Sequence, residues 1–285
     1  MNLAFLCLYV MRKHFFYIAV SFLALSFVAC DDDIMSDDEL VEVIEPVDDL
    51  VRLQGITIED DAATVIQEIE IDYDEKSLIR QITFSGMENV LYNMTYAIND
   101  RLIAFEKVQN GQTTSNTLDY NNNLITLTTT FPDATVQQKE LSIDFQNRIN
   151  FVRTFDVATN GSRTATDQTQ YVYSQNFNVE RINDLRPTGN SIESTTELTY
   201  LFNNNPFRDM NDVIRFLIFE EFVPYTRYLP ATLEERFNSN GPPVDGRFVS
   251  YDYTLQEDDF PSSRTVSSTT ATGTQTTVET FNYLP

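Results

Sequence analysis

The sequence is poor in the residues that most enzymes use for catalysis. It contains one histidine, two cysteines and no tryptophan in 285 residues. The histidine, His14, and the first cysteine, Cys7, both lie in an N-terminal segment that we predict to be removed. Without them, Ser-His-Asp and Cys-His catalysis, disulfide bonds and zinc sites built from His or Cys are excluded. The sequence therefore predicts no catalytic residue, no metal site and no cofactor, and a protein that is not an enzyme.

Positive charge is also scarce. Beyond residue 29 the chain holds 17 Lys and Arg against 43 Asp and Glu, a formal net charge of −26, and its three lysines are Lys76, Lys107 and Lys139. A surface this acidic repels phosphate backbones, so binding to nucleic acid is excluded.

The chain has no hydrophobic run long enough for a membrane-spanning helix. Its longest run, Phe15–Val28, has 14 residues, whereas a span needs about 20. Arg12 and Lys13 precede the run, and Ala29 and Cys30 end it. A positive start, a short apolar middle and a small residue before the cut predict a cleaved export signal over residues 1–29, with translation starting at Met11.

Because Cys30 stands at the cut, the segment resembles a bacterial lipoprotein signal, although Phe27 occupies the place where leucine is usual. The resemblance implies acylation of Cys30 and attachment to a membrane through it. Asp31, Asp32 and Asp33 are similar to the surface-export signal of Bacteroidota lipoproteins, which implies an outer-membrane location facing the cell exterior. The alternative is an ordinary secreted protein with an acidic linker. Half of residues 31–50 are Asp or Glu, which predicts a flexible tether over residues 30–50.

From Val51 onward apolar and polar residues alternate. Leu141, Ile143 and Phe145, for example, alternate with Ser142 and Asp144. A period of two places one face of a strand on a core and the other in water, which favours an antiparallel sheet. We predict a single antiparallel β domain over residues 51–285.

A loose repeat runs through this domain. A predicted strand ends on an aromatic residue every 23 to 28 residues, first at Tyr73 and then at Tyr96, Tyr120, Phe145, Tyr173 and Tyr200, with later examples at Tyr253 and Tyr283. A unit of this length is typical of an array of supersecondary elements, here hairpins. The pattern resembles YD-type repeats without their regular glycine. It predicts an all-β meander, forming a curved sheet or a barrel-like structure.

One segment departs from the alternation. In residues 206–222, Met210, Val213, Ile214, Leu217 and Ile218 have helical spacing, and Asn205-Pro206 suits a helix start. Phe216 and Phe219 interrupt the stripe, so we expect an inserted helix that is buried on more than one side. A strand through Ile214–Phe219 is the alternative. The capping-box sequence Thr232-Leu-Glu-Glu235 predicts a short second helix.

Tyr200 followed by Asn203-Asn-Asn-Pro-Phe207 resembles a Tyr…Asn-Pro-Phe junction in a family of uncharacterised Bacteroidota lipoproteins. The similarity covers roughly residues 118–285. It implies a porin-like, all-antiparallel domain with one interrupting helix, and it transfers no catalytic residue.

The candidate ligand contacts are aromatic residues around this segment: Tyr200, Phe202, Phe207, Tyr225 and Tyr228. Such rings stack on sugars, and loops on a rigid scaffold commonly bind ligands. The alternative is that they cap the core.

Acidic pairs offer weaker candidates. A glycoside hydrolase needs two carboxylates about 5 Å or about 6.5–9.5 Å apart; the pairs considered for this are Glu220-Glu221, Glu234-Glu235 and Asp258-Asp259. Calcium could bind at Asp60-Asp61 or Asp72/Asp74, although no EF-hand pattern is present.

These observations predict a lipid-anchored, non-enzymatic binding or accessory module whose partner is a glycan, a peptide or an outer-membrane protein. The alternatives are a carboxylate-dependent carbohydrate hydrolase and, if the barrel encloses a cavity, a carrier of an apolar ligand. A membrane-spanning barrel is disfavoured because most predicted strands are shorter than the required 9–11 residues.

Overall fold

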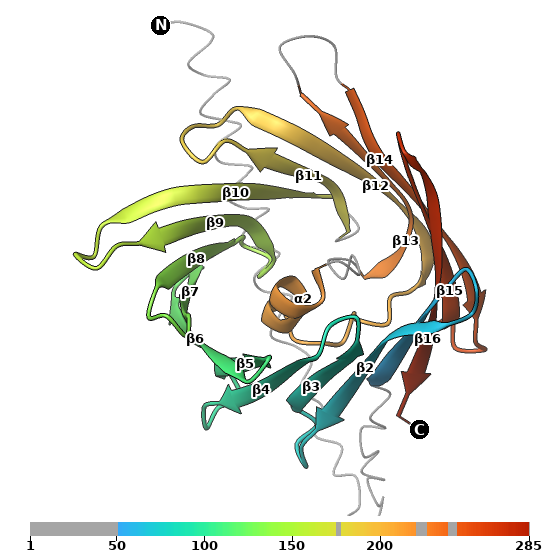
Figure 1. Ribbon diagram of the computed structural model, residues 1–285, viewed down its shortest axis with the longest axis horizontal. Helices are drawn as coiled ribbons and strands as arrows, with labels where there is room; N and C mark the ends of the chain where they lie inside the picture. The colour runs from blue at the N-terminus through green and yellow to red at the C-terminus, as the bar shows by residue number, and fades with distance from the viewer. Residues whose placement is uncertain (1–50, 175–177, 221–226, 239–243, 285) are drawn as a thin grey trace, which may run out of the picture. The chain divides into compact units, whose positions relative to one another are not determined.

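Sixteen antiparallel strands form a closed barrel around one helix in the computed structural model, which describes residues 51–174, 178–220, 227–238 and 244–284 (Figure 1). Each strand pairs with the next along the chain, and β16 closes the ring on β1. The strands are β1 Leu53–Asp60, β2 Val65–Tyr73, β3 Ile79–Gly86, β4 Val90–Tyr96, β5 Leu102–Gln109, β6 Gln112–Asn121, β7 Leu124–Thr130, β8 Val136–Ile143, β9 Ile149–Val157, β10 Arg163–Tyr173, β11 Val179–Leu185, β12 Ile192–Asn204, β13 Tyr228–Phe237, β14 Val244–Leu255, β15 Pro261–Thr270 and β16 Gly273–Tyr283. The predicted all-β meander is confirmed, and it is a closed barrel.

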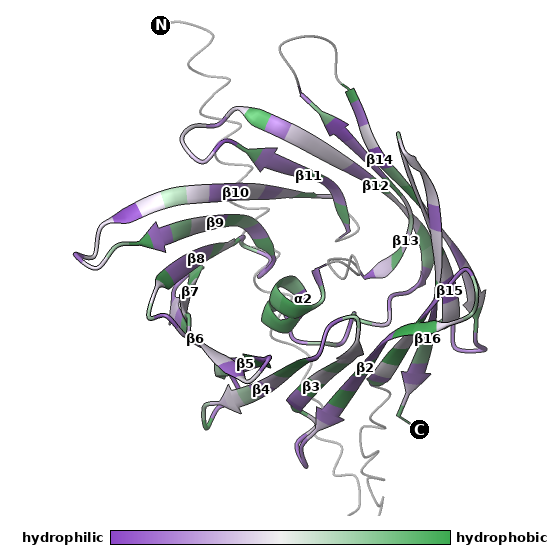
Figure 2. Cartoon of the chain, in the orientation of Figure 1, coloured by the Kyte–Doolittle hydropathy of each residue, from purple (hydrophilic) through white to green (hydrophobic). Residues whose placement is uncertain are grey.

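The barrel is apolar inside and polar outside. In β2, Ile69 and Ile71 are buried, whereas Glu68, Glu70 and Asp72 between and beside them are exposed. Purple and green segments also follow one another on β3 in Figure 2, whereas β8 and β10 carry longer polar stretches. Because successive side chains of a strand point to opposite faces, one pattern supplies both the core and the solvated wall.

Seven tyrosines tie the barrel together at one end, which we call the tyrosine rim. Tyr73 at the end of β2 donates its hydroxyl to the Leu53 carbonyl at the start of β1, at 2.8 Å, and Tyr96 of β4 donates to Ile79 of β3, also at 2.8 Å. The same bond recurs at the ends of the other even-numbered strands, from Tyr120, Tyr173, Tyr200, Tyr253 and Tyr283. The aromatic repeat of the sequence is therefore a repeated cross-strand hydrogen bond within each hairpin.

Strand β8 is the exception to this series. Ile143 pairs with Ile149 in the way that Tyr73 pairs with Ile79, so an apolar side chain stands where the other hairpins have a phenol. Phe145, which we expected to end this strand, lies in the following turn and is 89% exposed.

The tyrosine rim makes stability sensitive to alkaline pH. Burial, partly opposed by Arg52, raises the pKa of Tyr73 to about 12, and burial also raises the pKa of the other six rim tyrosines. An unfolded tyrosine titrates near pH 10. The stability supplied by the neutral phenols is therefore complete below about pH 10 and is lost as pH rises through the folded pKa values.

We expect the urea midpoint to fall steeply above about pH 10, with phenolate absorbance at 295 nm appearing together with unfolding. Tyr96→Phe removes one phenol and its hydrogen bond, so it should lower stability at neutral pH by about 1 kcal/mol and flatten the alkaline decline. Phenols that ionise near pH 10 in the folded protein would contradict the buried rim.

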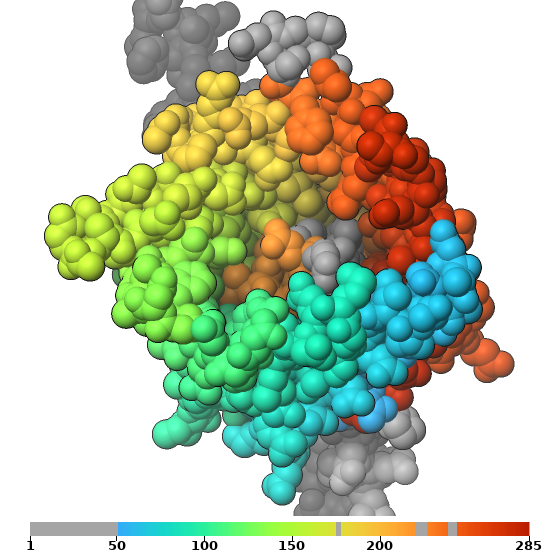
Figure 3. Space-filling model, viewed as in Figure 1, coloured from blue at the N-terminus to red at the C-terminus, as the bar shows by residue number. Residues whose placement is uncertain are grey.

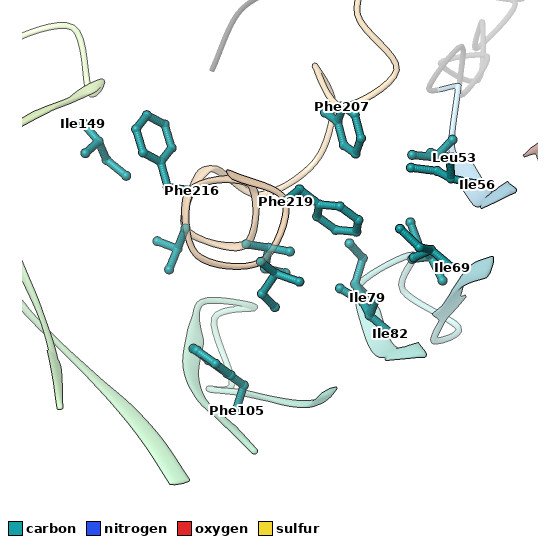
Figure 4. Packing of buried hydrophobic residues seen from close by; sticks show 14 of the residues in the cluster. Leu53, Ile56, Ile69, Ile79, Ile82, Phe105, Ile149, Phe207, Phe216 and Phe219 are labelled. Carbon is teal, nitrogen blue, oxygen red and sulfur yellow. The ribbon is translucent and has the colours of Figure 1, made fainter. Parts of the chain in front are cut away.

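Helix α2, Asp212–Ile218, lies inside the ring of strands (Figure 1). It begins where the Asn211 side chain accepts hydrogen bonds from the Val213 and Ile214 amides, and its buried residues Val213, Ile214, Phe216 and Ile218 cover most of its circumference. Such an all-round apolar helix must be buried. Figure 4 shows Phe216 and Phe219 pointing from it toward opposite walls.

The inserted helix near residues 206–222 is thus confirmed, including its burial on several sides, and the alternative strand does not form. It starts later than expected, because Pro206–Asp209 forms turns in which the Asn205 side chain accepts from the Phe207 amide at 3.0 Å. No helix in the described ranges is both long and apolar enough to cross a bilayer.

The predicted second helix at Thr232–Glu235 is wrong, because these residues belong to β13. Thr232 and Leu233 pair with β12 on one side and with β14 on the other, and Leu233 is buried in the core. A capping box provides hydrogen bonds for two backbone amides, whereas the two neighbouring strands provide them along the whole segment. The strand conformation is therefore more stable here than the helix.

Candidate binding site in the barrel interior

A pocket of about 410 Å³ lies between α2 and the wall formed by β4 to β8. Leu217 of α2 borders it on one side, and Tyr92, Phe105 and Leu127 supply apolar surface from the wall. The remaining strand residues that line it are polar: Lys107, Gln109, Gln112, Thr114, Asn116, Thr129, Gln137 and Lys139. Figure 3 shows the molecule hollowed at its centre, with α2 recessed inside the ring.

Strand register places these side chains in the interior. Lys107 pairs with Tyr92 on β4 and with Thr114 on β6, while Lys139 pairs with Leu127 on β7. Directly paired residues share a face of the sheet, and Leu127 belongs to the core. The same wall thus changes from apolar residues near the tyrosine rim to polar residues toward the opposite end.

The pocket is positively charged in a strongly acidic protein. Two of the three lysines beyond residue 29 line it, and no Asp or Glu does. Neither Lys107 nor Lys139 forms an ion pair with any residue that the structure describes; Lys107 Nζ lies 5.9 Å from the centroid of the Tyr92 ring. A carboxylate is linked to the lining through Gln137, whose Nε2 donates to Asp156 Oδ1 at 3.4 Å.

Hydrogen bonds fix one amide in the wall. Asn116 is 6% exposed, its Oδ1 accepts from Thr129 Oγ1 at 2.8 Å, and its Nδ2 donates to the Thr114 carbonyl at 3.4 Å. A buried amide held by two partners is preorganised, which lowers the entropic cost of binding a polar molecule.

The other pockets have a different electrostatic character. At the tyrosine rim, about 360 Å³ is bordered by Lys76, but its ammonium lies 2.7 Å from Asp100 Oδ1. A smaller pocket of about 300 Å³ includes Glu88, Arg247 and Glu279, so both signs of charge are present.

The five aromatic residues proposed from the sequence do not gather at one place. Tyr200 belongs to the tyrosine rim, and Phe207 is wholly buried beside Phe219, with ring centroids 5.1 Å apart. Phe202 is 83% exposed and packs its edge on Tyr228 at 5.8 Å. Tyr225 lies outside the described residues, as do Cys30, Asp31, Asp32 and Asp33. Ligand contact by the exposed Phe202 and the half-buried Tyr228 stays a prediction.

The acidic candidates mostly organise turns or pair with arginine. Asp60 Oδ1 accepts from the Ala62 and Thr64 amides, and Asp74 Oδ1 accepts from Lys76 and Leu78. Glu234 pairs with Arg236 at 2.7 Å. Within the described ranges, no group of three His, Cys, Asp or Glu comes together in a way that could hold a metal ion.

Sequence reasoning did not single out Lys107 and Lys139. One signal was available. Lys139 precedes Leu141 by two residues and Ile143 by four, and Lys107 follows Phe105 by two residues. Each lysine therefore shares a strand face with core residues, where a charge is costly without a function.

No family model and no curated protein matches this chain. Among solved structures, a porin-like protein from Bacteroides vulgatus is similar, with 15% identity over 83% of this chain and 100% of the other, at a TM-score of 0.43. A second porin-like protein, from Bacteroides uniformis, has 12% identity over 81% and 96% of the two chains, at a TM-score of 0.40. The strand pairing of this chain itself defines its class: a closed antiparallel barrel with an internal helix and a polar pocket beside it.

Proposed function

We propose that this protein is a lipid-anchored, non-enzymatic binding protein of the outer membrane, and that its ligand enters the barrel beside α2. The observation that carries the proposal is the pocket of about 410 Å³, which is lined by two lysines, amides and hydroxyls and by no carboxylate. Polar groups are placed inside a barrel at a cost in stability, and ligand binding is the function that such a lining supports.

The outer wall supports a barrel that sits outside the bilayer. Charged residues are exposed next to buried core residues on strands around the ring: Glu68, Glu106, Asp119, Glu197 and Asp252. A membrane barrel has the opposite arrangement, with an apolar band facing lipid, and charges on that face are destabilising. Attachment is therefore assigned to acylated Cys30, with Asp31–Asp33 directing the protein to the exterior.

Metabolic labelling with a fatty-acid probe tests the anchor. Wild-type protein should be labelled and recovered in the outer-membrane fraction, and protease added to intact cells should digest it. Cys30→Ala should abolish both labelling and membrane recovery, because the acyl chains are the attachment. Cys7→Ala is the matched control and should remain labelled, since Cys7 precedes the predicted start at Met11 and is absent from the mature protein. Equal labelling of wild type and Cys30→Ala would overturn the anchoring.

The two alternative functions would use other parts of the molecule. The interior around α2 is filled largely by the hydrophobic core, which includes Ile214, Phe216 and Phe219. An apolar carrier would use the pocket of about 360 Å³ at the tyrosine rim, whose lining is mainly apolar. The described acidic candidates for a hydrolase do not line the pocket that we assign to the ligand: Glu220, Glu234, Glu235, Asp258 and Asp259. Glu221 lies outside the described residues. Turnover of a polysaccharide by the purified protein would favour the hydrolase over a binding protein.

A further inference from the structure

We propose that the pocket beside α2 binds an acidic sugar, which Lys107 and Lys139 contact from different parts of the lining. This deepens the proposed function by naming the class of ligand, and it rests on that function. Three features of the pocket support it: its charge, the chemistry of its lining and the placement of the two lysines.

The charge of the pocket is the first reason. Both lysines are partly buried, both line one cavity, and no carboxylate shares its lining. Charges withdrawn from water are ordinarily paired, because the loss of hydration is otherwise uncompensated. The buried guanidinium of Arg264 follows this rule, since its Nε lies 2.8 Å from Glu279 Oε2. The two ammonium groups of the pocket thus lack the partner that an anionic ligand would supply.

The lining describes the rest of the ligand. Gln109, Gln112, Gln137 and Thr114 present neutral donors and acceptors, which suit hydroxyl groups. Tyr92 and Phe105 add ring surface for the apolar face of a sugar. The volume of about 410 Å³ is at the lower end of the range for small-molecule sites. A compact anion rich in hydroxyls satisfies all three features.

The two lysines approach the cavity from different directions. Lys107 is on β5 and Lys139 on β8, three strands apart, or about 14 Å across the wall at the usual strand spacing. The register adds an offset along the strands, because Lys107 pairs with Thr114, whereas Lys139 pairs with Leu127, which pairs with Leu118. The two lysines therefore border different parts of one pocket, and a ligand between them would contact each lysine with a different group. Leu217 of α2 bounds the cavity on the side facing them.

Calorimetry on the detergent-solubilised mature lipoprotein tests this assignment. The probes are D-glucuronate, the neutral methyl glucoside and inorganic phosphate, each at low and high salt. We expect glucuronate to bind at least about tenfold more tightly than either of the others, and to weaken as salt screens the lysines.

Variants assign the binding to the pocket. Lys107→Gln and Lys139→Gln should each weaken glucuronate binding about ten- to hundredfold, and the double variant should abolish it, because each removes a charge-assisted contact. Lys76→Gln is the matched control; it removes the third lysine, whose ammonium is already paired with Asp100, and should leave binding unchanged. Melting curves close to wild type verify that each variant is folded.

Three results would overturn the inference: glucuronate binding that survives the double variant, equal binding of the neutral glucoside, or phosphate binding as tight as glucuronate. The proposed function fails separately. If no acidic sugar binds but the lipoprotein captures a neutral glycan or an envelope protein, the binding function stands and this ligand class is wrong. If nothing binds in any of these experiments, both fall.

Discussion

Replacing Phe219 with alanine is expected to lower the free energy of unfolding by about 3–5 kcal/mol, the usual cost of deleting a buried phenyl ring. Phe219 follows α2 directly and has no exposed surface. Its ring centroid lies 5.1 Å from that of Phe207 and 6.2 Å from that of Phe84 on β3, so it joins the helix segment to the wall (Figure 4). The loss combines the transfer free energy of the ring with the cavity left behind, because a closed barrel wall can relax only partly.

Phe202→Ala provides the matched control for this experiment. The chemical change is identical, but Phe202 is 83% exposed, so its removal should change stability little. Both variants are compared with wild type by urea denaturation monitored through far-ultraviolet circular dichroism. Equal effects of the two substitutions would mean that α2 does not occupy the barrel interior as described.

Glu279→Gln is expected to cost a similar amount, about 3–5 kcal/mol, for an electrostatic reason. Glu279 and Arg264 are 6% and 3% exposed, and Arg264 Nε donates to Glu279 Oε2 at 2.8 Å. The guanidinium also lies over the rings of Tyr251 and Phe281, at 5.3 and 5.7 Å from their centroids. Removing the carboxylate charge leaves the buried guanidinium without its countercharge, beside two aromatic rings.

Two further variants separate this explanation from loss of packing. Glu234→Gln removes a carboxylate from an ion pair with Arg236 on the exposed wall, and it should have little effect because water and salt screen such pairs. Arg264→Met combined with Glu279→Leu removes both charges and should recover most of the stability lost in Glu279→Gln. Failure of the double variant to recover stability would indicate that shape, and not the uncompensated charge, causes the loss.

Much of the fold could be read from residue order. The alternation in segments such as Leu141–Ile143 predicted strands, although Phe145 lies in the turn that follows. The aromatic repeat predicted hairpins of regular length. The interrupted apolar pattern at Phe216 and Phe219 predicted a helix buried on several sides, which α2 is. These features can be predicted locally, because the spacing of apolar residues along a strand or helix shows which of its faces must be buried.

The wrongly predicted second helix has a physical cause. Thr232–Glu235 has a good local sequence for a helix start, yet it forms β13 because β12 and β14 are available on both sides. Local hydrogen bonding competes with pairing partners that are distant in the sequence, and no short motif states which partners will be present.

The sequence by itself determined that the chain folds as antiparallel hairpins, that it has few groups suited to catalysis, and which strand faces are apolar. Only the tertiary structure decided that β16 pairs with β1, that α2 fills the resulting barrel, and that Lys107 and Lys139 border one pocket. The physical reason is that alternation fixes the face on which a side chain lies, whereas the curvature and closure of the wall fix which side chains meet across it.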